Sequence, residues 1–263
     1  MNNNVSLLIS TCNKFSDLWD LHIEFLKKNW VGELWKVYMV TDCPTDKQYK
    51  NVEIIVADGG LDFPARIKYA LDFIDTDYVL LTLDDYFLIE KTYAEKLDYL
   101  AERAKNEQID YLLLYDRRYL NPKKYENIEA LRPIDLNERY SVNLYPAIWN
   151  KSFLKNSVKE DLSPWQYEPT LTKYAKEANG NCMFSHNGAF DILDVIRKGK
   201  LLHKAKRYLK KNGFELPERP TVSYFTEIKL EIMAQISWHA PKWLFHLLKK
   251  TAKAFGMKFY NED

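Results

Sequence analysis

The sequence has few cysteines, no long apolar run and almost no net charge, and each shortage excludes a class of protein. Three cysteines, Cys12, Cys43 and Cys182, occur among 263 residues. They lie far apart and form no CxxC pair, which argues against a zinc site. Their odd number argues against a disulfide framework. A reducing cytoplasm suits such a chain best.

The chain also lacks segments that would insert into or cross a membrane. No uninterrupted apolar stretch approaches the length of about 18 residues that a spanning helix needs. The first residues carry no basic charge, and the apolar run over residues 5–9 is too short for a signal peptide. We therefore expect a cytoplasmic protein.

Charge and composition indicate a folded protein that does not bind nucleic acid by its overall charge. Lys and Arg number 38 and Asp and Glu number 37, which gives a formal net charge of +1. This balance offers no bulk attraction for nucleic acid, so we expect no nucleic-acid partner. Hydrophobic residues make up 46%, enough for a sizeable core. Aromatic residues reach 14%, which fits either a Tyr-rich core or a site that stacks on sugars or bases.

Apolar runs alternate with helical patterns in the first half of the chain. The runs predict strands over residues 5–9, 35–40, 52–56, 78–83 and 111–115. Helical spacing predicts helices over residues 15–29 and about 92–104, and another that carries Ile67, Leu71 and Ile74 on one face. This rhythm predicts a mainly parallel α/β sheet flanked by helices on both faces. Its ligand crevice is expected beyond the carboxyl ends of the strands.

The second half is less regular. A helix is predicted from Pro164 to about residue 178, ended by Asn179 and Gly180, and a short strand over residues 183–186. Residues 190–211 and 222–255 are predicted to be helical, with breaks near Pro217, Pro220 and Pro241. We expect one α/β domain over residues 1–190 and a helical extension over residues 191–263.

Polar residues follow four of the predicted strands. Thr11, Asp42, Asp58 and the pair Asp84-Asp85 each stand at a strand's carboxyl end, where the crevice is expected. Two adjacent carboxylates repel each other and are stabilised when a cation lies between them and a phosphate. A solvated turn that caps a helix would explain the same pair.

Three of these segments resemble family 2 glycosyltransferases. Residues 5–14 (VSLLISTCNK) resemble the family's opening strand, residues 40–46 (VTDCPTD) are similar to its Val-Asp-Asp-Gly-Ser-Thr-Asp segment, and Leu83-Asp84-Asp85 resembles its Asp-x-Asp metal motif. The matches follow the family's order and cover about residues 5–90. Two departures are Leu83 at the first Asp of the motif and Thr41-Asp42 in place of Asp-Asp.

The resemblance implies a GT-A fold and transfer of a sugar from a nucleotide-sugar donor. It implies that Asp85 holds a divalent metal, Mn²⁺ or Mg²⁺, on the donor diphosphate, with Asp84 nearer the ribose or metal. A divalent ion neutralises the charge that develops on such a leaving group. The resemblance also places Thr11 beside the nucleotide and Asp42 near its base or ribose.

Two further residues complete the predicted donor site. The resemblance places Asp58 near the base. Arg66 opens the helix after Asp58 and is expected to contact phosphate, although a surface Arg in a first helical turn would look the same.

An inverting transfer needs a carboxylate that takes the proton of the acceptor hydroxyl. Glu160-Asp161 reproduces the family's Glu-Asp letters, and residues 163–168 (SPWQYE) resemble the Pro-Trp-x-x-Glu stretch of bacterial capsule and lipopolysaccharide sugar transferases. We prefer Glu168 as the base and keep Asp161 as second choice; a carboxylate favoured by the helix dipole would explain either. Trp165 is expected to stack on the acceptor sugar.

The five histidines offer one further metal ligand. By resemblance to several GT-A enzymes, His186 would complete the metal shell; a hydrogen-bonded structural His is the alternative. The remaining histidines are expected on helix surfaces.

The end of the chain is basic. Arg197, Lys200, Lys204, Arg207 and Lys211 are predicted to share one helix face, which suits a diphosphate-bearing acceptor or simply solvent. Residues 241–255 predict a basic amphipathic helix that binds a membrane surface, on the inner face, or docks on the protein's own core.

The predicted function is thus sugar transfer to a surface glycan, either a saccharide or a lipid-linked saccharide. Two alternatives stay open. One is a non-catalytic nucleotide- or glycan-binding protein, since the Asp-x-Asp motif is incomplete. The other is a sugar-phosphate nucleotidyltransferase, which would normally have a Gly-rich loop where residues 11–14 have none.

Overall fold

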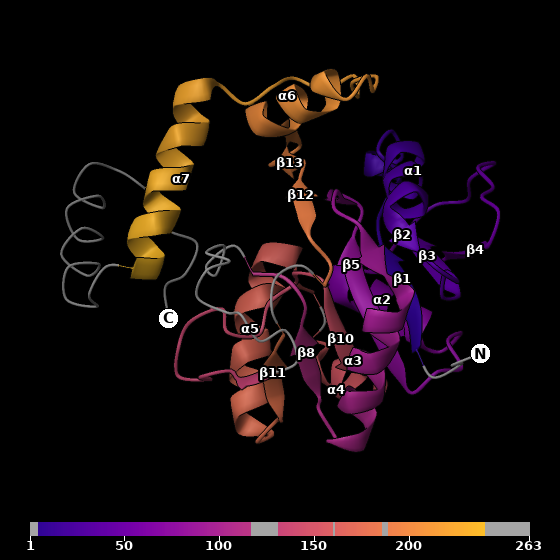
Figure 1. Ribbon diagram of the computed structural model, residues 1–263, viewed down its shortest axis with the longest axis vertical. Helices are drawn as coiled ribbons and strands as arrows, with labels where there is room; N and C mark the ends of the chain where they lie inside the picture. Colours follow the sequence, from indigo (N-terminus) through magenta and orange to yellow (C-terminus); the bar gives the residue numbers. More distant parts are fainter. Residues whose placement is uncertain (1–4, 117–130, 160, 186–188, 240–263) are drawn as a thin grey trace. The chain divides into compact units, whose positions relative to one another are not determined.

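A computed structural model describes residues 5–116, 131–159, 161–185 and 189–239 (Figure 1). The chain forms two compact units, Met1–Asp194 and Val195–Asp263. The first contains the large sheet and the helices that cover it. The described part of the second, residues 195–239, contains a hairpin and two helices.

The first unit is built on an eight-stranded sheet with the order β4-β3-β1-β5-β10-β8-β11-β9. Its strands are β1 (Val5–Ser10), β3 (Val37–Thr41), β4 (Val52–Val56), β5 (Tyr78–Leu83), β8 (Tyr111–Leu113), β9 (Arg132–Pro133), β10 (Ala147–Asn150) and β11 (Cys182–Phe184). The first four in the order are parallel, whereas β10 runs antiparallel between β5 and β8. The prediction of a mainly parallel sheet is confirmed.

Helices cover both faces of this sheet (Figure 1). One face packs against α1 (Trp19–Asn29) and α3 (Ala94–Asn106), and the other against α2 (Phe63–Leu71), α4 (Lys151–Ser157) and α5 (Pro164–Glu177). Successive side chains of a strand point to opposite faces, so Leu7 and Ile9 of β1 join the first core and Leu8 joins the second. Burial on both faces explains why these strands read as continuous apolar runs.

Short sequence patterns predicted the ends of several strands and helices. Both β4 and β5 cover the predicted residues. The predicted helix at Pro164 is α5, where Ser163 and Gln166 form a capping box that satisfies the first backbone N–H groups. The helix predicted from residue 92 begins at Ala94, because Thr92 and Tyr93 form β7 (Thr92–Tyr93), which pairs with β2 (Trp30–Val31).

The predicted helix over residues 190–211 is wrong in its first half. β12 (Ile192–Asp194) pairs antiparallel with β6 (Tyr86–Leu88), and β13 (Ile196–Arg197) forms a hairpin with β14 (Lys200–Leu201). Lys198 and Gly199 have φ angles of 51° and 75°, the left-handed backbone of a tight turn. Only α6 (His203–Lys211) is helical. Arg197 and Lys200 therefore do not share a helix face with Lys204, Arg207 and Lys211.

The second unit continues from the hairpin through α6 to α7 (Tyr224–His239). The latter confirms the start of the helix predicted over residues 222–255. The basic amphipathic helix predicted over residues 241–255 lies outside the described residues. Within the residues that are described, no helix is both long and apolar enough to cross a bilayer.

Candidate functional site

The strand order reverses between β1 and β5. From β1 the chain moves to β3 and then β4 on one side, and α2 then carries it back to β5 on the other side of β1. Open α/β sheets bind their ligands beyond the carboxyl ends of the strands at such a reversal. Ser10 and Leu83 are paired at the ends of these strands, so Thr11 and Asp84 flank this point.

The side chains of Thr11 and Asp84 are hydrogen-bonded. The Thr11 hydroxyl donates to Oδ2 of Asp84 and accepts the indole N–H of Trp19 at 2.6 Å. Because Trp19 can only donate, the Thr11 hydroxyl keeps its own proton for an acceptor, and the Asp84 carboxylate lies closer than the Cys12 carbonyl oxygen at 3.4 Å. Both residues are buried, with Asp84 only 7% exposed. Thr11 thus holds Asp84 in one orientation.

His22 supports Asp84 from α1. Its Nδ1 lies 3.1 Å from the backbone carbonyl oxygen of Asp84, and its ring packs edge-on against Phe87. Burial lowers the pKa of His22 to about 4, and the bond to Asp84 only partly opposes this. The imidazole is therefore neutral near pH 7 with its proton on Nδ1, since a carbonyl can only accept. The prediction that this histidine lies on a helix surface is wrong.

Asp42 and Asp58 follow the next two strands at the same edge of the sheet. Oδ1 of Asp42 accepts the backbone N–H of Asn13 at 2.7 Å, and Oδ1 of Asp58 accepts that of Gly60 at 2.9 Å. The backbone at Gly59 comes close to Asp42: a Cβ atom there would lie 3.3 Å from the Asp42 carbonyl oxygen. The loops after β1, β3 and β4 are therefore in contact, as their parallel arrangement predicts.

Arg66 reaches the same group from α2. Its charge acts on the neighbouring thiol of Cys12. The pKa of this thiol is raised to about 11 by burial and by the carboxylates of Asp84 and Asp42, and the positive charge of Arg66 partly offsets this rise. Arg66 donates from Nη1 to the carbonyl of Leu61 at 3.1 Å. Its Nε is buried and has no hydrogen-bond partner among the described residues. The guanidinium therefore retains a donor for an anionic ligand.

A second acidic group surrounds Tyr86. Burial raises the pKa of Tyr86 well above its usual value, and Tyr145, Asp85, Asp194 and Glu168 raise it further. Asp194 stands directly opposite Tyr86 in the pairing of β12 with β6. Three carboxylates from distant parts of the chain thus converge near one phenol.

Glu168 and Asp161, the two predicted bases, occupy different surroundings. Oε1 of Glu168 accepts the backbone N–H of Leu144 at 3.2 Å, and its charge also raises the pKa of Tyr140 after burial has done so. Asp161 is exposed with a φ of 62°. The next residue, Leu162, donates its N–H at 2.8 Å to Asp62, the residue that caps α2. Of the two, Glu168 lies in the acidic group that includes Asp85.

Trp165 stands three residues before Glu168 on α5 and is 59% exposed. Residues three apart on a helix lie on neighbouring parts of its surface. The indole is therefore exposed near Glu168, the predicted base, as stacking on a sugar would require.

The carboxylates suit a metal that the substrate helps to hold. Mg²⁺ and Mn²⁺ prefer oxygen ligands, and Mg²⁺ is commonly bound by one or two carboxylates together with substrate phosphates. Asp85 is partly exposed, whereas Asp84 is buried and engaged by Thr11. Across the described ranges, no three His, Cys, Asp or Glu side chains are placed to hold a metal by themselves. His186 lies outside those ranges, so its role stays a prediction.

Sequence reasoning missed Trp19, His22, Tyr86 and Asp194. Asp194 follows the same rule as the predicted residues, a carboxylate at the end of an apolar run, but that run was predicted to be helical. For the two residues of α1, no sequence signal pointed to the site.

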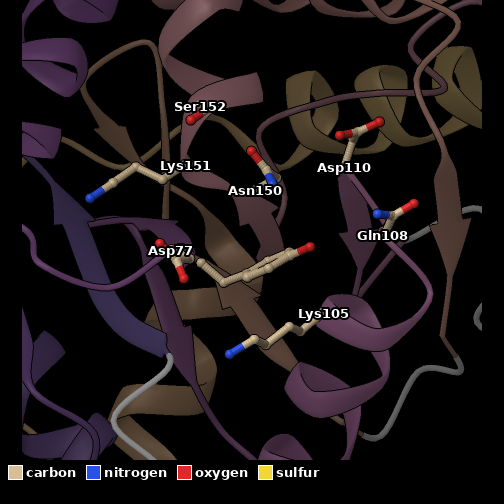
Figure 2. A pocket seen from close by; sticks show the side chains of 8 residues that line it. Asp77, Lys105, Gln108, Asp110, Asn150, Lys151 and Ser152 are labelled. Carbon is tan, nitrogen blue, oxygen red and sulfur yellow. The ribbon is translucent and has the colours of Figure 1, made fainter.

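Two cavities lie where the parallel strands begin, at the end of the sheet opposite to the polar residues. One of about 340 Å³ is lined by Asp77, Tyr78, Lys105, Gln108, Asp110, Asn150, Lys151 and Ser152, and Figure 2 shows these side chains. A larger one of about 790 Å³ includes Val5, Val37 and Val52. These three residues and Tyr78 begin their strands, so neither cavity belongs to the group of polar residues at the carboxyl ends.

The chain is similar in structure to known proteins, although its sequence matches none of the family profiles or curated proteins. The structure is similar to that of Staphylococcus aureus TarS 1–349 in complex with UDP-GlcNAc, with a TM-score of 0.53 and 18% identity over 75% of this chain and 60% of that one. The chain therefore spans less than two thirds of this TarS structure.

It is also similar to the mannosyltransferase PcManGT from Pyrobaculum calidifontis in complex with GDP-Man and Mn²⁺. Here the TM-score is 0.52 with 11% identity over 97% of this chain and 81% of that one. Likeness at such low identities shows the fold alone. The expected α/β fold of the GT-A type is confirmed.

Proposed function

We propose that this protein is a glycosyltransferase that moves a sugar from a nucleotide-sugar donor to a saccharide acceptor. The observation that carries the proposal is the group formed by Thr11, Asp42, Asp84 and Arg66 where the strand order reverses. It stands on a fold that binds UDP-GlcNAc in TarS and GDP-Man in PcManGT.

The donor nucleotide would lie along the ends of β1, β3 and β4. In this proposal Asp42 contacts the base or ribose and Asp58 the base, while Arg66 contacts the diphosphate through its remaining donors. Thr11 lies beside the nucleotide and acts through Asp84, whose carboxylate it orients.

Asp85, with Asp84 beside it, would hold Mn²⁺ or Mg²⁺ on the donor diphosphate. When bound, such an ion neutralises the negative charge that grows on the leaving nucleoside diphosphate. The partial exposure of Asp85 and the orientation of Asp84 by Thr11 and His22 support this assignment.

Glu168 would act as the general base of an inverting transfer. It takes the proton of the acceptor hydroxyl while that oxygen bonds to the anomeric carbon; the bond to the diphosphate breaks, and its electron pair leaves with the diphosphate. Trp165 would pack against the apolar face of the acceptor sugar. Asp161 is the alternative base.

The acceptor would be a surface glycan such as a capsule, lipopolysaccharide or other lipid-linked saccharide. This part rests on the resemblance of residues 163–168 to bacterial capsule and lipopolysaccharide sugar transferases. Attachment to the inner membrane face through residues 241–255 belongs to the same proposal.

Thermal unfolding in the presence of nucleoside diphosphates tests the donor site. We expect one of UDP, GDP or another nucleoside diphosphate to raise the unfolding temperature, and to do so more with Mn²⁺, because a ligand that binds only the folded state stabilises it. Asp85→Ala should abolish the metal-dependent part. Asp75→Ala, which removes an exposed carboxylate at the opposite edge of the sheet, should leave it intact.

The products released during turnover distinguish a glycosyltransferase from the two alternatives, a non-catalytic binding protein and a sugar-phosphate nucleotidyltransferase. Release of nucleoside diphosphate from a nucleotide-sugar supports a glycosyltransferase. Binding without turnover indicates a non-catalytic protein, and release of pyrophosphate from a nucleoside triphosphate and a sugar phosphate indicates a nucleotidyltransferase. Wild-type binding and turnover in Asp85→Ala would refute the metal assignment.

A further inference from the structure

The net charge of the whole chain is small, but positive and negative residues are unevenly divided between the two units. Residues 195–263 carry 15 Lys and Arg against 6 Asp and Glu, a net charge of +9, whereas residues 1–194 carry 23 against 31, a net charge of −8. The second unit is therefore strongly basic by itself, although the whole chain is nearly neutral.

Much of this positive charge lies on one face of α6. The helix buries Ala205 and Leu209. At about 100° per residue, Arg207, Lys210 and Lys211 project on the opposite side. All three are exposed and form no ion pair within the described part of the chain. The helix itself contains no acidic residue.

An apolar stripe lies along the described part of α7. Tyr224, Phe225, Ile228 and Ile232 project within an arc of about 100°, and their exposed fractions are 51%, 84%, 39% and 53%. Exposure of neighbouring large apolar side chains is typical of an interaction surface. Leu230, 40% exposed, projects on the other side of the helix.

Specific contacts join the two helices. The carboxylate of Glu227 on α7 accepts the backbone N–H groups of His203 and Lys204, the first residues of α6. The rings of His203 and Tyr224 meet edge to face, with centroids 5.6 Å apart. His203 lies on the same side of α6 as Arg207 and Lys210, and Tyr224 begins the stripe of α7. The basic face and the apolar stripe therefore meet at this ring contact.

We propose that α6 and α7 together form a docking surface for an anionic lipid bilayer. Basic side chains attract the negative headgroups, and exposed aromatic and aliphatic side chains enter the boundary between headgroups and acyl chains. A nucleic acid would use the basic face but would leave the apolar stripe uncovered. A second copy of the chain would bring two units of net charge +9 together. The inference does not depend on sugar transfer, and without residues 241–255 the second unit still carries 11 Lys and Arg against 6 Asp and Glu.

Vesicle flotation of the full-length protein tests the proposal. The wild type should float with vesicles of phosphatidylcholine and phosphatidylglycerol, float much less with phosphatidylcholine alone, and bind less as salt rises. The double variant Phe225→Ser with Ile232→Ser should weaken binding by about tenfold. Arg207→Glu with Lys211→Glu should weaken it at least as much, since each basic side chain near the surface contributes about fivefold.

Matched controls use equivalent changes elsewhere. Leu230→Ser removes an exposed apolar side chain from the other side of α7, and Lys68→Glu reverses an exposed charge on α2; both should bind like the wild type. Circular dichroism and thermal unfolding establish that each variant is folded.

Three results would overturn the proposal. The first is a wild-type protein that does not float with anionic vesicles. The second is binding that survives both double substitutions, which would assign the membrane contact to other residues. The third is a dimer, seen by light scattering, that dissociates in the Phe225→Ser, Ile232→Ser variant, because the stripe would then be covered by a second copy.

Discussion

His22 donates from Nδ1 to the backbone carbonyl of Asp84 over 3.1 Å, so a buried side chain of α1 holds the residue that follows β5. The bond needs a proton on Nδ1, and burial of the ring keeps the other nitrogen, Nε2, unprotonated near pH 7. Protonation at Nε2 would keep this bond but would place a positive charge in a fully buried position, so its cost falls on the stability of the fold.

Stability should fall between about pH 6.5 and pH 4 because of His22. Burial lowers its pKa from 6.5 to about 4 in the folded protein. Between these values the unfolded chain binds a proton that the folded protein does not, so acid favours unfolding; the effect is absent above pH 6.5 and reaches about 3 kcal/mol near pH 4. Urea unfolding at several pH values should show a steeper loss in wild type than in His22→Asn. Equal slopes would contradict the prediction.

Thr11→Val should destabilise the protein by about 1–3 kcal/mol, because it removes the hydroxyl donor from the buried carboxylate of Asp84. It should also weaken nucleotide binding. Thr11→Ser keeps the hydroxyl and should restore most of both effects. Denaturant unfolding and calorimetric titration measure the two quantities. A Thr11→Val variant as stable as wild type would show that the bond contributes little.

Cys12 can report on the charges of the site. Its thiol has a pKa of about 11, raised chiefly by burial and then by Asp84 and Asp42, with Arg66 opposing. Asp42→Asn should lower this pKa and Arg66→Gln should raise it. The rate of alkylation followed against pH, in a background without the other cysteines, gives the value for each variant. Shifts in the opposite directions would separate Cys12 from these groups.

Glu168→Gln should lower the rate of transfer by about 10²–10⁴-fold without changing donor affinity, since Gln can still accept the Leu144 N–H but cannot take a proton. Asp161→Asn should lose little activity. Single-turnover kinetics and donor titration separate the two effects. If the losses are reversed, Asp161 is the base.

Trp165→Ala should raise the KM for a saccharide acceptor by about tenfold while the donor affinity stays unchanged, because stacking on an aromatic ring contributes about 1 kcal/mol or more. Trp165→Phe should recover part of the loss. An unchanged acceptor KM would place the acceptor away from this side of α5.

The sequence predicted those parts of the fold whose signal is local. β5 is a six-residue apolar run that both faces of the sheet bury, and Pro164 marks the start of α5 because its fixed backbone suits a first turn. β12 has only three residues and exists through its pairing with β6, about a hundred positions earlier. Such a strand has no period to detect, and it was predicted as helix.

The same distinction applies to the site. Thr11, Asp42, Asp58 and Asp84 were predicted because parallel strands bring their carboxyl ends to one edge, whatever the details of packing. Asp194 depends on the pairing of β12, and His22 on which side of α1 faces β5 and β6. Both are properties of long-range contacts.

The antiparallel strand β10 has a consequence for how the chain is made. It fills the gap between β5 and β8, yet it follows them by many residues. Until residues 147–150 emerge from the ribosome, β5 therefore has an unpaired edge and β8 has neither of the strands that flank it, since β11 comes later still; such edges invite pairing with other chains. Shortened versions that stop before this strand should aggregate, so the amino-terminal portion alone would be a poor choice for crystallisation or nucleotide screening.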